Sequence, residues 1–163
     1  MGDAASLIKK YKGRGALFDT NLLVLLLVGS INERRIPEFK RTQDYSIADF
    51  RTLKRLVQWF GTLSITPHVL SQVSDLTKLS GRELDMVREQ FREFVVSAEE
   101  CSYSARELVH HPLFARFGLA DASVSAACEQ NRLVLTADLD LYIALTSRGL
   151  DAVNFRHVRA LAW

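Results

Sequence analysis

Short apolar runs alternate with longer segments of helical periodicity along this chain. The runs cover residues 16–18, 64–66, 133–135 and 152–155. Between them, apolar residues recur every three or four positions, as over residues 47–60, which is typical of the buried face of a helix. Strands that alternate with helices favour a parallel sheet covered by helices on both faces. We therefore expect an α/β protein.

The remaining helical patterns fit the same alternation. We expect helices over residues 21–31, from Pro67 onward, over 84–95, from Asp121 onward and over 139–147. Proline is tolerated in the first turn of a helix, and aspartate is favoured at a helix start. In such a sheet, ligands bind in the crevice beyond the carboxyl ends of the strands.

Length and composition indicate one globular domain. The chain has 163 residues, of which 48% are hydrophobic, so a chain of this length can bury roughly 70% of its unfolded surface without a metal or disulfide. This excludes a collagen-like fibre, a disordered tail and a disulfide mini-protein. We divide the chain into a basic extension over residues 1–14 whose start is disordered, a domain over 15–155 and a tail over 156–163.

Neither a membrane span nor a disulfide framework is expected. The longest apolar run, residues 22–28, has seven residues, against the roughly 20 that a spanning helix needs. Asp19 and Asn21 interrupt the apolar stretch and argue against a signal peptide. Cys101 and Cys128 lie far apart, outside any CxxC pattern, which favours two buried thiols in a reducing cytoplasm.

Charge is uneven along the chain. The net charge of +2 divides into +5 over residues 1–60 and −3 over residues 61–163. This asymmetry permits a basic rim beside an acidic centre, although solvated helix faces produce the same balance.

Carboxylates follow two of the predicted strands. Asp19 comes directly after residues 16–18, and Asp138 follows residues 133–135 closely, so both belong at the same edge of a parallel sheet. Asp121 and Asp140 can reach that edge too. Clustered carboxylates repel one another unless cations or shared protons are present, and all-oxygen ligands favour Mg²⁺ or Mn²⁺. The alternative is that each aspartate only caps a helix, a role worth about 1 kcal/mol.

Four motifs in order resemble the PIN-domain family. They are LFDTN, TPHVLSQV, GLADA and LTADLD, which begin at Leu17, Thr66, Gly118 and Leu135. The resemblance covers about residues 15–155. It implies a three-layer α/β/α sandwich with a central parallel sheet and a Mg²⁺- or Mn²⁺-dependent ribonuclease that cleaves RNA. It also implies the toxin of a toxin–antitoxin pair, an antitoxin protein as partner, and a homodimer.

The resemblance assigns roles to individual residues. Asp19, Asp121 and Asp138 match the catalytic acids that bind metal, and Asp140 matches the second acid of an Asp-x-Asp pair that binds a second metal or its water. Asn21 and Thr136 match positions that support the carboxylates by hydrogen bonds.

Gln72 departs from the family pattern, because family enzymes usually carry glutamate at this position. Glutamine keeps an oxygen ligand but loses a negative charge, which weakens attraction for a cation. Asp75, three residues on, faces roughly the same way and is a partial substitute. Three interpretations stay open: an active enzyme with a reduced acidic cluster, a natural pseudoenzyme that binds RNA or protein, and an engineered substitution that silences a toxic protein.

A basic segment between the first two long helices is a candidate for binding nucleic acid. It contains Arg34, Arg35, Lys40 and Arg41. Paired cations suit phosphate contacts, which position a nucleic acid without reading its bases. A solvated loop explains the same residues equally well.

Overall fold

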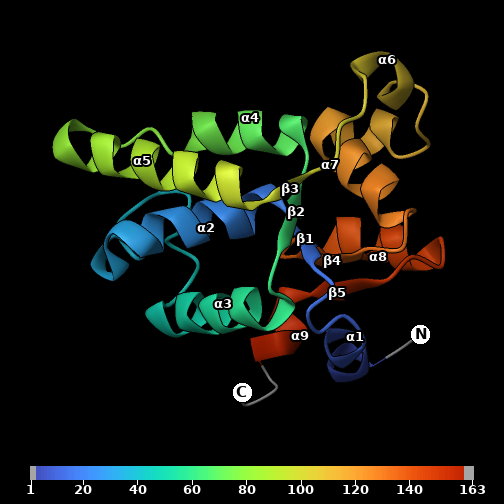
Figure 1. Cartoon of the computed structure of the whole chain (residues 1–163), viewed down its shortest axis with the longest axis horizontal. Coiled ribbons are helices and arrows are strands. Elements are labelled where there is room, and N and C mark those ends of the chain that lie inside the picture. Colours follow the sequence, from blue (N-terminus) through green and yellow to red (C-terminus); the bar gives the residue numbers. More distant parts are fainter. Residues whose placement is uncertain (1–2, 160–163) are drawn as a thin grey trace.

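The computed structural model describes residues 3–159 and shows a central parallel sheet flanked by helices (Figure 1). Within this part of the chain the sheet has five strands in the order β3-β2-β1-β4-β5, and every neighbouring pair is parallel. The strands are β1 (Ala16–Phe18), β2 (Leu63–Ile65), β3 (Glu99–Glu100), β4 (Leu133–Thr136) and β5 (Ala152–Asn154). The expected α/β class, with helix layers on both faces of the sheet, is confirmed.

The helices connect the strands in the expected alternation. They are α1 (Ala4–Lys10), α2 (Thr20–Ile31), the 3₁₀ turn η1 (Glu33–Arg35), α3 (Ile47–Phe60), α4 (Pro67–Leu76), α5 (Gly81–Ser97), α6 (Ala105–Leu108), α7 (Phe114–Cys128), α8 (Leu139–Ser147) and α9 (Phe155–Arg159). In Figure 1, α1 and α9 lie near β5, whereas α4 and α5 lie at the β3 end of the sheet.

Local capping explains why several helices begin where the sequence predicts. Asp19 caps α2 by accepting a hydrogen bond from the backbone N of Leu22 at 2.8 Å. Thr66 caps α4, and Pro67 occupies its first turn. Each cap joins groups within three residues of one another, so it can be predicted from the sequence.

The apolar run of residues 22–28 becomes the central helix of the core. All seven side chains of the run are buried, because α2 packs against α3, α4 and α5. Gly29 lets α3 approach closely, since a Cβ atom at this position would lie 2.4 Å from Cδ2 of Phe50. Among residues 3–159, every helix is too short or too polar to cross a lipid bilayer.

Helices α1 and α9 lie in the two end segments that the sequence set apart from the domain, and both pack against β5. The expectation of a disordered start is wrong for residues 4–6, because they form the first turn of α1, a helix that buries Ile8 completely. The predicted tail begins as helix α9, in which Val158 is fully buried. Residues 1–2 and 160–163 lie outside the described part of the chain.

Three local details differ from the sequence predictions. The two-residue strand β3 and the one-turn helix α6 are additional elements. The helix expected from Asp121 onward starts earlier, at Phe114, and continues across a kink at Gly118, whose φ of 80° and ψ of −174° are not helical. Glycine reaches this positive φ without the steric cost that a side chain would add.

Candidate acidic site at the sheet edge

The predicted acids gather at the carboxyl ends of the two central strands. Strand β1 lies between β2 and β4, and the chain proceeds outward from β1 to β2 and from β4 to β5 in opposite directions. This is the topological switch point at which open α/β sheets bind ligands. Phe18 pairs with Leu135 in the register of β1 and β4, so Asp19 and Thr136 emerge side by side.

Asp19 is a buried carboxylate held by several donors. Its side chain is 3% exposed. Its Oδ2 accepts hydrogen bonds from Thr136 Oγ1 at 2.5 Å and from the backbone N of Ala137 at 2.7 Å, while Oδ1 caps α2. Burial raises the pKa of Asp19, and these hydrogen bonds partly oppose the rise. The side chain is therefore fixed in orientation at a high electrostatic cost.

Asp138 stands at the neighbouring strand end and is open to solvent. Its Oδ1 caps α8 by accepting from the backbone N of Leu141 at 3.0 Å. Its own backbone N donates to Thr136 Oγ1, also at 3.0 Å. The Thr136 hydroxyl thus connects Asp138 to Asp19, which is the supporting geometry that the resemblance implies for Thr136.

Asp121 has a strongly perturbed carboxyl group. Burial, together with the charges of Asp19 and Asp138, raises its pKa from 3.8 to about 7. It lies inside α7, three residues past the kink at Gly118, and no helix cap accounts for it: within residues 3–159 its carboxylate accepts no hydrogen bond. Helix capping therefore explains Asp19 and Asp138 in part, but it does not explain Asp121.

Gln72 lies next to this group through Thr20. The Thr20 hydroxyl, directly after Asp19, donates to Gln72 Oε1 at 2.8 Å. Gln72 is exposed on α4, so its side chain contacts solvent as well as Thr20 at the acidic edge. Asp75 forms an exposed ion pair with Lys78 at 2.9 Å.

Asp140 and Asn21 lie farther out than the three central acids. The Asp140 side chain is 68% exposed and forms a 3.4 Å ion pair with Arg116. Asn21, in the first turn of α2, lines a neighbouring pocket.

The four predicted basic residues do not act as one group. Arg35 forms 3.1 Å ion pairs with Glu38 and with Glu83 of α5. Arg34 and Lys40 are exposed. Arg41 is the member of the set that lines the pocket containing Asn21.

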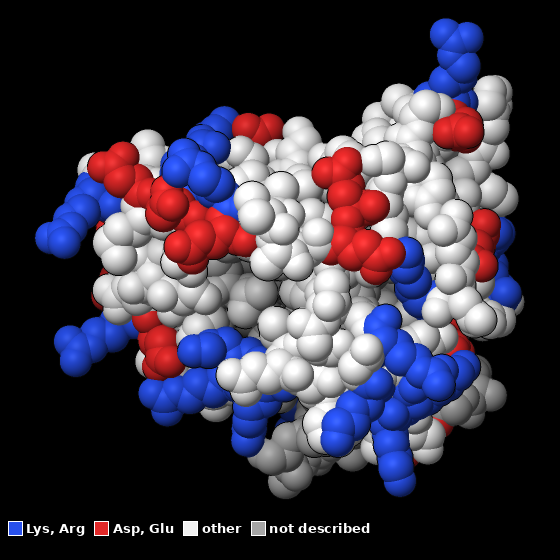
Figure 2. All heavy atoms as spheres, in the orientation of Figure 1, with Lys and Arg blue, Asp and Glu red and all other residues white. Residues whose placement is uncertain are grey.

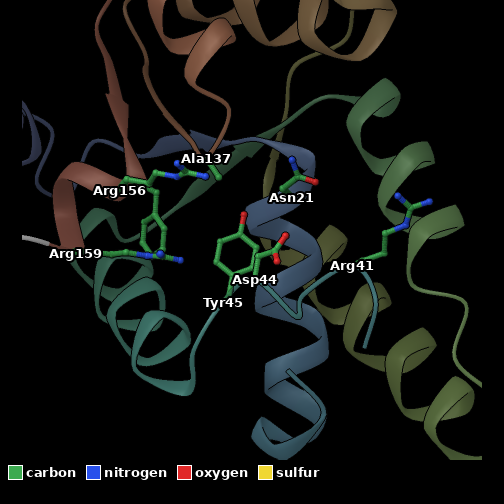
Figure 3. Close-up of a pocket in the computed structure, with 8 residues that line it drawn as sticks. Asn21, Arg41, Asp44, Tyr45, Ala137, Arg156 and Arg159 are labelled. Atoms are coloured by element: carbon green, nitrogen blue, oxygen red, sulfur yellow. The ribbon is translucent and has the colours of Figure 1, made fainter. Parts of the chain in front are cut away.

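That pocket contains residues that sequence analysis missed. It has a volume of about 230 Å³ and is also lined by Asp44, Tyr45, Arg156 and Arg159 (Figure 3). Arg156 directly follows the first residue of α9, just past the carboxyl end of β5. The rule that located Asp19 and Asp138 at strand ends applies equally to Arg156, although it was assigned to the tail.

The chemistry of the donors suits a hard divalent cation. The three central acids offer only oxygen, the ligand type that Mg²⁺ and Mn²⁺ prefer. Their charges act on one another, as the pKa of Asp121 shows. In residues 3–159, however, no three His, Cys, Asp or Glu side chains stand close enough to form a closed metal site. The oxygen donors of the three acids are of the type that Mg²⁺ and Mn²⁺ prefer. The three side chains would have to move closer together to bind one ion.

The comparisons with known proteins add no family assignment. No protein-family model matches the chain, and no curated protein is similar enough to count as a relative. The site itself is therefore the basis for proposing a function.

Proposed function

We propose that this protein is a divalent-metal-dependent endoribonuclease that hydrolyses RNA phosphodiester bonds. The observation that carries the proposal is Asp121, a half-buried carboxylate beside Asp19 and Asp138 that has no hydrogen-bond donor among the described residues. Such an arrangement costs free energy unless a cation or a proton neutralises it. Mg²⁺ or Mn²⁺, when bound, would activate water and stabilise negative charge on phosphoryl oxygens.

The residues divide the work according to their surroundings. Asp19 is rigid, because both of its oxygens accept hydrogen bonds. Asp138 has one oxygen occupied by the α8 cap, which leaves the other for a ligand. Asp121, with a pKa of about 7, takes up and releases a proton near neutral pH in the metal-free protein. Asp140 is exposed and would help to hold a second ion or its water, as the resemblance implies.

The test is cleavage of single-stranded RNA by the purified chain. A fluorescent RNA without stable secondary structure is incubated with Mn²⁺, Mg²⁺ or EDTA, and the wild type is compared with Asp121→Asn. Asp85→Asn is the matched control, because Asp85 is an exposed aspartate on α5. We expect cleavage by the wild type and the control in Mn²⁺, and none by Asp121→Asn. Equal cleavage by all three proteins would assign the activity to a contaminant and refute the proposal.

A second candidate function rests on Gln72. The neutral amide stands beside Asp19, where a further carboxylate would strengthen attraction for a cation. A protein with this reduced charge can serve as an RNA-binding or protein-binding module with little catalysis. RNA binding in EDTA together with absent cleavage at millimolar Mn²⁺ would favour this function over the first.

The toxin role is part of the same proposal and has its own test. RNA cleavage inside a bacterial cell halts growth, so induced expression of the wild type should arrest growth and Asp121→Asn should not. An antitoxin partner and a homodimer accompany this role in the resemblance. Growth that continues equally under both inductions, at equal protein levels, would remove the toxin assignment.

A further inference from the structure

The pocket beside the acidic edge is a basic cavity assembled from distant parts of the chain. Figure 3 shows Arg156 and Arg159 entering from α9 and Arg41 standing on the opposite side, with Tyr45 between them. The lining contains three guanidinium groups and one carboxylate, that of Asp44. Arg41 and Arg156 are more than 100 positions apart in the sequence, so the cavity exists only in the folded protein.

One of the three arginines is already fixed. Nε of Arg159 forms a 2.7 Å ion pair with Asp49, and its guanidinium lies 5.4 Å from the Tyr45 ring centroid and 5.7 Å from that of Phe155. The carboxylate of Asp49 partly neutralises the positive charge of Arg159. Arg159 therefore shapes the wall of the pocket and contributes less attraction for an anion than its neighbours.

The guanidinium groups of the other two arginines, Arg41 and Arg156, both belong to the pocket lining. Within residues 3–159, neither of these guanidinium groups forms an ion pair or a hydrogen bond. Asp44 supplies the carboxylate of the same lining, and it forms no ion pair with Arg41 or Arg156 in the described part of the chain. An excess of unpaired guanidinium charge in a concave site attracts an anion.

The pocket adjoins the site of the proposed reaction. Ala137 lines it and also donates its backbone N–H to Asp19 Oδ2 at 2.7 Å. Tyr45 also lines the pocket, and its phenol O–H can donate a hydrogen bond to an anion there. Ala137 is thus shared by the pocket and the acidic edge, so an anion in the pocket would lie close to that edge.

We propose that Arg41 and Arg156, with Tyr45, hold a phosphate group of the RNA strand next to the bond that the acidic edge cleaves. This inference rests on the proposed ribonuclease function. Guanidinium groups match phosphate geometry, because their parallel N–H donors bind two oxygens at once. The carboxylates of Asp19, Asp121 and Asp138 repel phosphate. Arg41 and Arg156 attract phosphate in the adjoining pocket and so compensate for that repulsion.

The distribution of charge on the wider surface is consistent with a longer binding path for the RNA backbone. Figure 2 shows Lys and Arg side chains gathered over α1 and α3, and Asp and Glu side chains gathered over α5 and β3. Both α1 and α9 pack against β5, and α1 contacts α9. A strand seated at α9 would therefore leave the pocket toward basic rather than acidic surface.

The experiment measures RNA binding without cleavage. Anisotropy of a labelled single-stranded RNA is titrated in EDTA at several salt concentrations with wild type, Arg156→Ala, Arg156→Lys and Arg41→Ala. Arg82→Ala is the control, because Arg82 is an exposed arginine of α5 outside the pocket. Thermal unfolding of each variant verifies that it is folded.

We expect Arg156→Ala and Arg41→Ala each to weaken binding roughly tenfold, from the loss of a charged hydrogen bond. Each should also reduce the slope of log K against log salt by about 0.7, the value for one phosphate contact on a single strand. Arg156→Lys should keep the slope and lose part of the affinity. Affinity and slope equal to those of Arg82→Ala would overturn the proposal.

Two RNAs distinguish the sources of the phosphate. The same sequence is titrated with a 5′-hydroxyl and with a 5′-phosphate end. Equal losses in Arg156→Ala assign the pocket to an internal phosphate, and a loss confined to the phosphorylated RNA assigns it to the terminal group. If the arginine variants bind weakly while the wild type never cleaves in Mn²⁺, the pocket stands and the ribonuclease fails. If cleavage requires Asp121 but the variants bind normally, the pocket fails instead.

Discussion

Replacing Asp121 with asparagine should stabilise the metal-free protein at neutral and alkaline pH. In the described part of the chain the side chain accepts no hydrogen bond, and burial with the charges of Asp19 and Asp138 raises its pKa from 3.8 to about 7. The folded state therefore binds this proton more tightly than the unfolded state does. Asparagine keeps the size of the side chain and removes the charge.

The direction of the pH dependence follows from that difference. At pH 4 and below, the carboxyl is largely protonated in the folded and unfolded states, so the mutation has little effect through charge. Between about pH 4 and pH 7 the unfolded chain ionises first, and wild-type stability falls. Above pH 7 both states are ionised and the penalty is constant. The stability gain of Asp121→Asn should thus grow from pH 4 to pH 7 and then level off.

The magnitude comes from the same rise in pKa. A change from 3.8 to about 7 corresponds to at most about 4 kcal/mol. Solvent reaches this half-buried carboxylate, and the asparagine amide still needs hydrogen-bond partners, so we expect a gain of about 1–3 kcal/mol at pH 8.

The assay is urea unfolding in EDTA at pH 5 and pH 8, followed by circular dichroism. Asp85→Asn again serves as the exposed control and should change stability equally little at both pH values. Saturating Mn²⁺ should stabilise the wild type at pH 8 and stabilise Asp121→Asn less, because a ligand that binds the folded state raises its stability. A loss of stability in Asp121→Asn that is the same at both pH values would refute the electrostatic account.

Three further substitutions test other parts of the structure. Gln72→Glu should keep the hydrogen bond from Thr20 and strengthen Mn²⁺ binding, so Mn²⁺-dependent RNA cleavage should rise; equal or lower cleavage at saturating metal would count against the site. Asp19→Asn should abolish cleavage and lower stability by about 1–3 kcal/mol, because an amide N–H would face the Ala137 donor; activity that persists would remove Asp19 from the site. Gly29→Ala should lower the free energy of urea unfolding by about 1–3 kcal/mol, since its Cβ would lie 2.4 Å from the ring of Phe50, and an unchanged midpoint would show that the α2–α3 contact can relax.

Elements fixed by neighbouring residues were predictable from the sequence. The start of α4 depends on Thr66 and Pro67, and the start of α2 on the contact between Asp19 and the Leu22 backbone. These interactions span three residues at most. The carboxylates at the ends of β1 and β4 could be assigned to one edge for a related reason, because parallel strands in one sheet end at the same side.

Elements without a local pattern were not predictable in the same way. Strand β3 has two residues, both exposed glutamates, so it lacks the apolar run by which a buried strand is recognised. Helix α6 has the capping box of Ser104 and Glu107 but only one turn, too short to show helical periodicity. The burial of Ile8 in α1 depends on the contact of that helix with β5, at the other end of the chain.

The sequence by itself determined the alternation of strands and helices, the helix caps and the acids expected at one edge of the sheet, because these depend on local spacing and on the direction of the strands. Only the tertiary structure decided that Asp121 is half-buried without a donor among residues 3–159, that Gln72 accepts a hydrogen bond from Thr20, and that Arg156 and Arg41 line one pocket. Each of these depends on burial or on a contact between segments at least 50 residues apart. Burial and long-range contact set the charge balance of the site, which periodicity along the chain does not encode.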